Sequence, residues 1–373
     1  MTSRFNRSHR SVKRTVDMTG PQAHPRFANC MKRLEPKQNS SEGSLLRVMA
    51  SRPTHRLGLL NNPLSGGNRN GFEKIRAVAA AQPEVVQREV QTPSDVTEAL
   101  SDFARNEVSV LVVNGGDGTV QAALTAIFNH SFFETRPALA VLPSAGTTSM
   151  IAGDVGLKGS RLNALERLFS WVRTKNNGAR HIERAVLKVQ VPPKNIPVYG
   201  MFFGAAAIYQ ASQFFHQKVH SRGVRGEIGA GVALVRFCWA VLLKDRNFVS
   251  SVPIQVGLNQ NAPEKQNYLM VLITTLQRLF LGLSPFWGSQ SKPLHYTAID
   301  AHPRHFLQAL PSMIRGRQNR LVQPINGYIS HNIDEARLIL DSGFNLDGEL
   351  YHTDNQLGPV VVGYGGQASF LQV

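Results

Sequence analysis

Along residues 56–142, short apolar runs alternate with longer segments in which apolar positions recur with a helical period. Runs that are apolar at nearly every position are typical of strands buried on both faces, and the helical period marks amphipathic helices. The pattern predicts strands at 56–60, 85–90, 108–113 and 138–142, and helices at 71–82, 94–105 (capped by Ser94) and 118–128. Strands that alternate with helices in this way predict an α/β fold with a doubly wound parallel sheet.

A different pattern begins near residue 181, where apolar runs follow one another with few helical segments between them. It predicts strands at 184–191, 197–209, 251–259, 266–276 and 336–349, and helices near 207–220 and 226–243. We therefore expect a basic tail at 1–52, an α/β domain at 53–180 and a β-rich domain at 181–373. The last residues of the β-rich domain are expected to pack back on the α/β domain.

Charge is distributed unevenly along the 373 residues, which carry a net charge of +16. Residues 1–48 hold ten basic and three acidic side chains, a net charge of +7, and show almost no apolar periodicity. Such a segment is expected to be a disordered tail, or to precede a true start at Met49; the alternative is an electrostatic tether. A balance this basic favours an acidic partner such as nucleic acid, an anionic lipid surface or a phosphorylated substrate.

The cysteines and the longest apolar segments indicate in which cellular compartment the protein is expected. Cys30 and Cys238 are far apart and form no CxxC pair, which excludes a disulfide framework and suits the reducing cytoplasm. Segments 228–243 and 268–283 are too short for a membrane span, and each contains an arginine. We expect a cytoplasmic protein without a transmembrane segment, either free or peripheral on the inner membrane face. The aromatic stretch 277–288 is expected in the core, with a membrane interface as the alternative.

Three glycine-rich loops follow three of the predicted strands: NNPLSGGNRNG at 61–71, NGGDGT at 114–119 and PSAGTTS at 143–149. The carboxyl ends of parallel strands share one edge of the sheet, and ligands bind there. Glycines let backbone N–H groups approach phosphates closely, and the helix that follows turns its positive end to the same place. The loops therefore predict a polyphosphate site. Asp117 repels phosphate, so it is expected to act through a divalent cation or to orient a nucleotide hydroxyl.

Four motifs in this order resemble those of the diacylglycerol kinase catalytic family: NPLSGG at 62–67, GGDGT at 115–119, PSAGTTS at 143–149 and LDGELYH at 346–352. The resemblance implies a two-domain lipid kinase fold, in which the doubly wound sheet is followed by a β-sandwich-like domain on the lipid side of a cleft. It also implies transfer of the γ-phosphate of ATP, with Mg²⁺, to a hydroxyl of diacylglycerol or a related lipid.

The family's motifs also imply roles for individual residues of this chain. Glu349 matches the residue that serves as the general base in bacterial members, with Asp347 beside it, and Asp117 is the alternative base. A carboxylate in this role accepts the proton of the attacking hydroxyl. The residues implied to contact ATP are Asn62, Pro63, Ser65, Gly66, Thr92, Gly115, Gly116, Asp117, Gly118, Thr119, Gly146 and Thr147.

The chain departs from the family pattern at several positions. Ser149 and Gln121 stand where asparagine is usual, and both keep hydrogen-bonding ability. The Asp-Asp-Gly stretch that holds a structural magnesium in bacterial members is not evident, since Asp300 is the single acidic residue in segment 296–305. The metal site therefore stays unknown, and a catalytically impaired nucleotide- or lipid-binding relative remains an alternative.

A kinase of a soluble substrate such as NAD is a further alternative, although no nicotinamide-dinucleotide site is evident. The expected partner is a lipid substrate at the membrane surface. No nucleic acid is expected, because the basic residues concentrate in the tail and no nucleic-acid motif is present. A homodimer is left open.

Overall fold

The structure is a computed structural model that describes residues 55–65, 68, 71–143, 149–174, 178–194, 196–222 and 250–373. Five of the predictions above fall outside these residues. They are the disordered tail, the helix at 226–243 and the ATP contacts at Gly66, Gly146 and Thr147.

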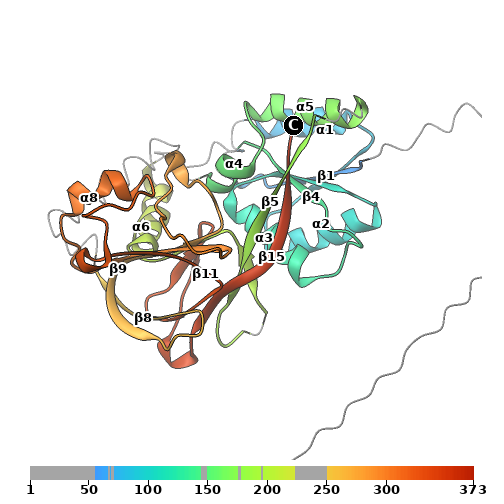
Figure 1. Cartoon of the computed structure of the whole chain (residues 1–373). Coiled ribbons are helices and arrows are strands. Elements are labelled where there is room, and N and C mark those ends of the chain that lie inside the picture. The colour runs from blue at the N-terminus through green and yellow to red at the C-terminus, as the bar shows by residue number, and fades with distance from the viewer. Residues whose placement is uncertain are drawn as a thin grey trace, which may run out of the picture. The chain divides into compact units, whose positions relative to one another are not determined.

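Four parallel strands form the first part of the sheet (Figure 1). Strand β1 pairs with β2 on one side and β3 on the other, and β3 pairs with β4. Their bounds are Leu57–Asn61, Val85–Glu89, Val110–Asn114 and Ala138–Val141. Every residue of β1, β3 and β4 is buried, as expected for apolar strands covered on both faces.

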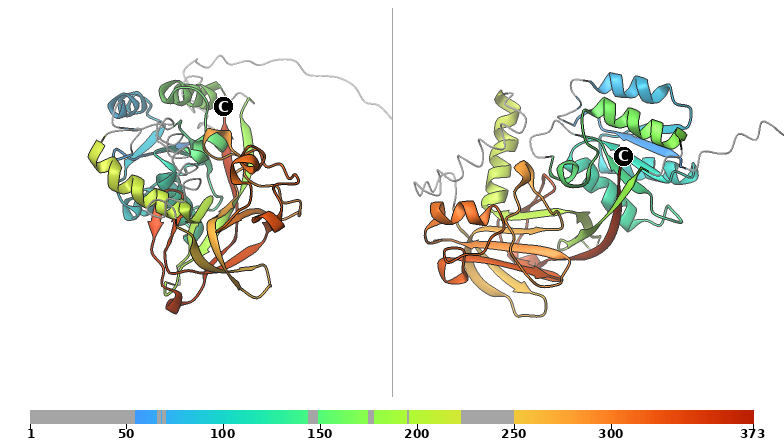
Figure 2. Two further views of the ribbon diagram at one scale, coloured as in Figure 1. Left: turned by 90° about the vertical axis from the view of Figure 1, so that its left-hand side faces the viewer. Right: turned by 45° about the horizontal axis from the view of Figure 1, so that its top comes forward.

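Helices cover both faces of the parallel strands, so the predicted doubly wound sheet is confirmed. Helices α1 and α5 pack with Leu57 and Leu59 on one face, and Figure 2 shows these two helices side by side. Helices α2, α3 and α4 pack with Leu60 and Leu111 on the other face. The five helices span Phe72–Ala80 (α1), Pro93–Arg105 (α2), Asp117–Asn129 (α3), Met150–Val155 (α4) and Arg161–Thr174 (α5).

Helix α2 begins one residue earlier than its pattern predicts, and the predicted cap at Ser94 is wrong. Thr92 is the N-cap: its hydroxyl accepts a hydrogen bond from the backbone N–H of Asp95 at 3.2 Å. The Asp95 carboxylate accepts in return from the N–H of Thr92 at 2.9 Å. Pro93 occupies the first helical position, where its fixed φ and missing N–H do no harm.

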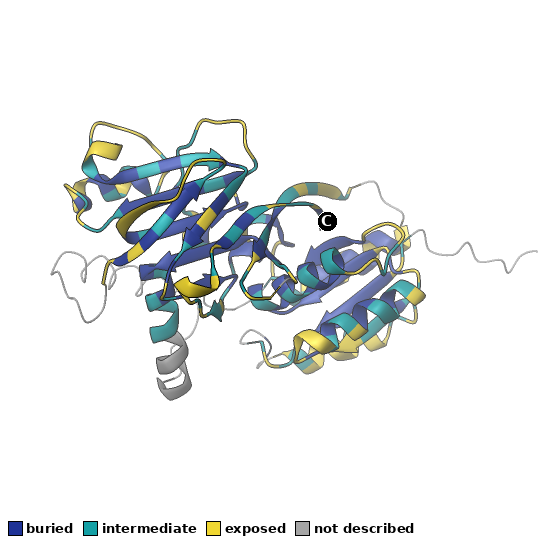
Figure 3. Cartoon of the chain, turned by 90° about the horizontal axis from the view of Figure 1, so that it is seen from below, coloured by how far each residue is buried: buried dark blue, intermediate teal, exposed yellow. Residues whose placement is uncertain are grey.

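Antiparallel strands make up most of the remaining structure and enclose a second core around Phe203, Ile254 and Phe344. In Figure 3 these strands alternate between buried and more exposed positions. The strands are β5 (Arg180–Gln190), β6 (Val198–Gly200), β7 (Phe202–Ala206), β8 (Val252–Leu258), β9 (Glu264–Thr274), β10 (Leu294–Asp300), β11 (Tyr328–Ile333), β12 (Glu335–Ile339), β13 (Phe344–Leu346), β14 (Glu349–Tyr351) and β15 (Val360–Gln372). The helical elements are α6 (Ala207–Arg222), α8 (Phe306–Met313) and the 3₁₀ turns η1 (Phe280–Gly282), η2 (Pro324–Asn326) and η3 (Asn355–Leu357).

Two of the predicted strands are wrong in extent, and in both a residue with positive φ ends a strand inside the predicted segment. Segment 197–209 is divided into β6 and β7, and Ala206, with φ 56°, ends β7 where α6 begins. Segment 336–349 contains β12, β13 and the first residue of β14. Asp347 and Gly348, with φ of 48° and 96°, make the sharp turn between β13 and β14. The pattern of apolar residues does not predict such turns.

The last strand connects the antiparallel strands to the parallel ones. Strand β15 pairs antiparallel with β12 and β5, and near its end Phe370 lies opposite Leu139 of β4 in parallel register. All fifteen strands of the described residues thereby belong to one continuous sheet. In the part of the chain that the structure describes, no helix is both long and apolar enough to cross a membrane.

Candidate active site

A polar edge forms where β1 and β3 end. Asn61 and Asn114 lie opposite each other, both buried, and the Asn114 side-chain amide donates to the Asn61 side-chain oxygen at 2.9 Å. The side-chain amide nitrogen of Asn61 has no partner among the described residues. A buried donor of this kind is normally satisfied by water or a ligand. The strand ends therefore provide polar groups at the edge where α/β sheets bind ligands.

Asn62 joins the first glycine-rich loop to helix α3. Its side-chain amide donates to the hydroxyl of Thr119 at 2.9 Å, and its backbone N–H donates to the carbonyl of Asn114 at 3.0 Å. Ser65 lies on the same loop, and a Cβ built on Gly116 would lie 3.6 Å from its hydroxyl oxygen. The structure thus brings Asn62, Ser65, Gly116 and Thr119 together at the N-terminus of α3, where backbone N–H groups favour an anion.

Asn68 and Arg161 link all three loops, although sequence reasoning did not select either residue. The amide of Asn68 donates to the carbonyls of Asn62 (2.6 Å) and Asn114 (3.1 Å). Its side-chain oxygen accepts from the guanidinium of Arg161, which also donates to the carbonyl of Pro143 at 3.1 Å. Burial lowers the pKa of Arg161. These two side chains therefore connect Asn62 and Asn114, which stand at the ends of β1 and β3, with Pro143 after β4.

A cavity of about 390 Å³ opens beside the first loop. Pro63, Asn68 and the first turn of α1, from Gly71 to Lys74, line it. Its size is within the range of small-ligand pockets. Its lining includes both a carboxylate, from Glu73, and an ammonium group, from Lys74, so its charge alone does not favour an anion.

Asp117, the first residue of α3, holds the helix that follows the third loop. Its two carboxylate oxygens accept from the backbone N–H groups of Met150 (2.9 Å) and Ile151 (3.2 Å). Ser149, the N-cap residue of α4, makes no capping bond with its own side chain. Asp117 thus supplies the cap acceptors of α4 from another helix. This structural role was not anticipated from the sequence.

Burial changes the acidity of two carboxyl groups in the site. It raises the pKa of Asp117 to about 7, against the lowering effect of the two N–H donors. Burial also raises the pKa of Asp347, and the nearby charge of Asp117 raises it further. The carboxylate of Asp347 accepts from the N–H groups of Met201 and Phe202, each at 2.9 Å. Asp117 and Asp347 therefore tend not to be ionised at the same time, because the charge of one favours the protonated form of the other.

We expect the stability of the wild type relative to Asp117→Asn to fall as the pH rises. The pKa of Asp117 is higher in the folded chain than in the unfolded chain, so its contribution is complete below about pH 4 and is lost through about pH 7. Urea unfolding of both proteins near pH 5 and pH 8 should show a relative loss on the order of 2 kcal/mol. A difference that does not change with pH would contradict the raised pKa.

Glu349 reaches the N-terminus of α3 from the turn between β13 and β14. The turn depends on the left-handed backbone of Asp347 and Gly348. The Asp347 carboxylate accepts from the backbone N–H of Phe202 and so holds the turn against β7. A Cβ built on Gly118 would lie only 2.5 Å from a carboxylate oxygen of Glu349. Glycine at position 118 therefore makes room for this carboxylate, and the positive end of α3 favours its charge.

A hydrogen bond between Gln121 and Tyr351 ties β14 to α3. The side-chain amide of Gln121 donates to the Tyr351 hydroxyl at 3.0 Å. Tyr351 lies two residues after Glu349 on the same strand, and burial raises the pKa of its hydroxyl. The bond therefore fixes the strand that carries Glu349 relative to the helix whose N-terminus Glu349 contacts. Gln121 is one of the two positions, with Ser149, at which the family pattern has asparagine.

We expect Tyr351→Phe to lower kcat by about fivefold while ATP affinity stays unchanged, because one hydrogen bond that positions Glu349 is lost. Steady-state kinetics with Mg-ATP as the varied substrate separates the two effects. Tyr364→Phe is the matched control, since Tyr364 is 46% exposed on β15. Wild-type turnover in Tyr351→Phe would mean that other contacts position Glu349.

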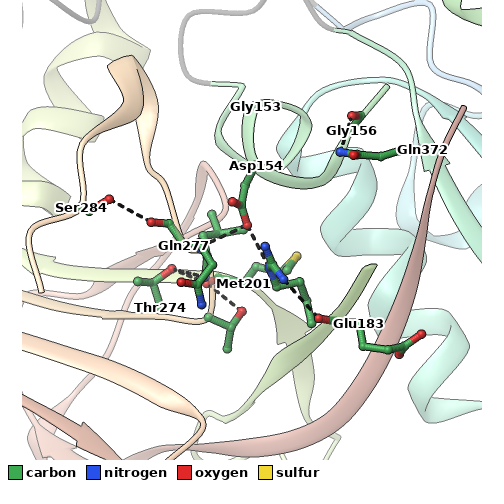
Figure 4. A network of polar contacts seen from close by, with 12 residues as sticks. Gly153, Asp154, Gly156, Glu183, Met201, Thr274, Gln277, Ser284 and Gln372 are labelled. Carbon is green, nitrogen blue, oxygen red and sulfur yellow. Dashed lines mark hydrogen bonds and ion pairs between the residues drawn. The ribbon is translucent and has the colours of Figure 1, made fainter. Parts of the chain in front are cut away.

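Asp154, at the other end of α4, anchors this helix to the antiparallel strands (Figure 4). Its carboxylate accepts from the guanidinium of Arg184 on β5 at 3.1 Å and from the backbone N–H of Gln277 at 3.2 Å. The side chain of Asp154 is 4% exposed, so the ion pair with Arg184 is buried. Helix α4 therefore contacts the central loop through Asp117 and the loop after β9 through Gln277.

Two expectations about the site receive no support from the geometry. The Thr92 side chain caps α2, and among the described residues it makes no hydrogen bond to the three loops. The described residues also contain no group of three or more His, Cys, Asp or Glu side chains that could hold a metal ion. Asp300 alone does not fit the structural magnesium of the bacterial members. Its buried oxygen has no partner in the described part of the chain, and burial raises its pKa.

The parallel strands with their glycine-rich loops are thus joined to antiparallel strands that carry the facing carboxylate of Glu349. Residues 56–177 match the sequence family described as the diacylglycerol kinase catalytic domain. This match confirms the resemblance drawn from the motifs and supports a kinase, that is, a phosphotransferase. Among curated proteins, none matches this chain in sequence.

Two solved structures of diacylglycerol kinases from Bacillus anthracis str. Sterne share the fold, one of them assigned to that class provisionally. The provisionally assigned protein is 18% identical, with a TM-score of 0.56 over 86% of this chain and 97% of that chain. The other is 16% identical, with a TM-score of 0.52 over 86% of this chain and 96% of that chain. At this identity the likeness concerns the fold.

Proposed function

We propose that this protein is an ATP-dependent lipid kinase that transfers the γ-phosphate of ATP to a hydroxyl of diacylglycerol or a related lipid. The observation that carries the proposal is the carboxylate of Glu349 against Gly118, at the N-terminus of α3 and beside the glycine-rich loops. Phosphoryl transfer needs groups that position the phosphates and a base near the attacking hydroxyl. These loops and Glu349 are suited to the two tasks.

In the proposed reaction, ATP enters as its magnesium complex and its phosphates contact the loops around Asn62, Ser65 and Gly116. The N-terminus of α3 offsets negative charge on the phosphates. The hydroxyl oxygen of the lipid attacks the γ-phosphorus, its proton passes to Glu349, and the bond from the γ-phosphorus to the bridging oxygen breaks. ADP and a phosphorylated lipid leave.

The lipid part of the proposal is supported by features outside the nucleotide loops. The net charge of +16 suits an anionic membrane surface, and the antiparallel half exposes the apolar side chains of Leu281, Leu307 and Ile325. The site residues Asn62, Ser65, Gly116, Gly118 and Thr119 are proposed as ATP contacts. Asp117 is proposed to act chiefly by holding α4, because both of its oxygens are bonded to that helix.

Incubation with γ-labelled ATP and a panel of lipid extracts, followed by separation of the labelled lipids, tests the proposed function. A labelled lipid that requires Glu349 is the expected result. Label on a water-soluble acceptor such as NAD would instead support the soluble-substrate alternative. ATP binding without transfer to any acceptor would support a nucleotide-binding relative that has lost catalysis.

A further inference from the structure

The segment between β10 and β11 concentrates positive charge that the proposed reaction does not use. We call residues 301–327 the basic cap. It contains no aspartate or glutamate. Its four arginines are exposed, and none forms an ion pair with a carboxylate in the described part of the chain. The four are Arg304, Arg315, Arg317 and Arg320.

The basic cap has its own packed interior, which holds these arginines on an ordered backbone. Phe306 and Met313, on the inner face of α8, pack in one cluster with Tyr328 of β11. The backbone N–H of Arg304 donates to the carbonyl of Asn326 at 2.9 Å, and the side-chain amide of Asn326 donates to the carbonyl of Arg320 at 3.2 Å. The two ends of the segment are thus hydrogen-bonded to each other.

The outer side of the basic cap mixes arginines with exposed aliphatic side chains. Leu307, Pro311 and Arg315 follow one another at four-residue spacing, so they lie along one side of α8 and its continuation. Leu307 is 47% exposed, and Ile325, next to Asn326, is 77% exposed. Aliphatic side chains set among cations are typical of surfaces that bind at the interface of a lipid bilayer.

The loop after β9 lies directly beside the basic cap. The backbone N–H of Ser284 donates to the carbonyl of Ile314 at 3.0 Å, and a Cβ on Gly316 would lie 2.5 Å from the carbonyl of Phe286. The tip of this loop presents Leu281, which is 52% exposed and has a left-handed φ of 56°. An apolar residue kept exposed in a conformation that costs energy suggests a function for the tip.

We propose that the basic cap, together with the tip at Leu281, is a docking surface for an anionic phospholipid bilayer. Charge complementarity favours an anionic partner, because four arginines stand in a segment without an acidic residue. Leu307 and Ile325 favour a bilayer over nucleic acid, since aliphatic groups gain free energy in lipid and find no apolar surface on a phosphate backbone. The loop with Leu281 leads back to α4 through the bond between Gln277 and Asp154.

This proposal rests on the proposed lipid kinase function, but it can be tested by binding alone, without measuring phosphoryl transfer. The full chain is sedimented with vesicles of phosphatidylcholine and phosphatidylglycerol, or of phosphatidylcholine alone, without ATP. The cap variant changes all four arginines of the basic cap to Gln. The control variant makes the same change in charge at four exposed cations elsewhere: Arg56, Arg180, Lys194 and Lys265.

We expect the cap variant to bind the anionic vesicles on the order of 10- to 100-fold more weakly than the control variant. Vesicles of phosphatidylcholine alone should bind all proteins weakly. Replacement of Leu307 and Ile325 by Ser should reduce the binding that remains at high salt, where charge attraction is screened. Thermal melting of each variant establishes that it is folded.

Equal binding of the cap and control variants to anionic vesicles would overturn the proposal. A cap variant that loses affinity for duplex DNA but keeps its affinity for vesicles would overturn it too, in favour of nucleic acid. Phosphorylation of detergent-dispersed lipid separates the two proposals, because it needs no vesicle. If no lipid is phosphorylated while the cap variant still loses vesicle binding, the kinase proposal fails and the docking surface stands.

Discussion

Glu349→Gln should lower kcat by roughly 10²- to 10⁴-fold, the usual contribution of general-base catalysis, and leave ATP affinity nearly unchanged. The substitution keeps the shape of the side chain but removes its ability to accept a proton. The turn that carries Glu349 is held by Asp347 through the N–H groups of Met201 and Phe202, so it is expected to keep its position.

Kinetics on the phosphorylated acceptor, together with ATP binding measured by calorimetry, check this expectation. Glu264→Gln is a matched control, because Glu264 is an exposed carboxylate at the start of β9. An unchanged kcat in Glu349→Gln would exclude Glu349 as the base. A chain whose wild type binds ATP but has no turnover would point to a non-catalytic relative.

The parallel half of the fold is predictable because strands buried on both faces are apolar at nearly every position. The runs that form β1, β3 and β4 are apolar at nearly every position, and each ends within two residues of the predicted position. The antiparallel half is harder to predict because its strands are separated by turns rather than helices. Asp347 at φ 48° reverses the chain inside a segment that reads as one strand.

The loops of the candidate site are predictable, whereas the contacts that fix them are not. Glycine-rich sequences after strands identify the first two loops, and the motif at 346–352 identifies Glu349. The Gln121–Tyr351 bond joins residues 230 positions apart, and the Arg161–Asn68 bond joins residues 93 apart. Each residue alone is an ordinary polar side chain, so only the folded chain reveals its partner. The same reason explains why the sequence did not indicate that Asp117 caps α4.

Asp117→Asn should abolish measurable phosphoryl transfer and also weaken ATP binding, in contrast to Glu349→Gln. The two oxygens of Asp117 accept from the N–H groups of Met150 and Ile151. An asparagine has one oxygen and one NH₂ group, so a donor would face one of these N–H groups. A buried donor without an acceptor costs about 1–3 kcal/mol, and the N-terminus of α4 would shift. The fold should survive, since the neutral side chain also removes a buried charge.

Activity, ATP affinity and thermal melting of Asp117→Asn separate the two roles of this carboxylate. Loss of kcat with unchanged ATP affinity would favour Asp117 as the base, and Glu349→Gln would then cost little. Loss of both, in a protein that still melts cooperatively, would fit the capping of α4 through Met150 and Ile151. Asp354→Asn is the matched control, because Asp354 is an exposed carboxylate that accepts from the backbone N–H of Gln356 in η3 and should leave ATP affinity near that of the wild type. Near wild-type turnover in Asp117→Asn at saturating Mg-ATP would exclude both roles, because neither the base nor the cap acceptors would then be needed.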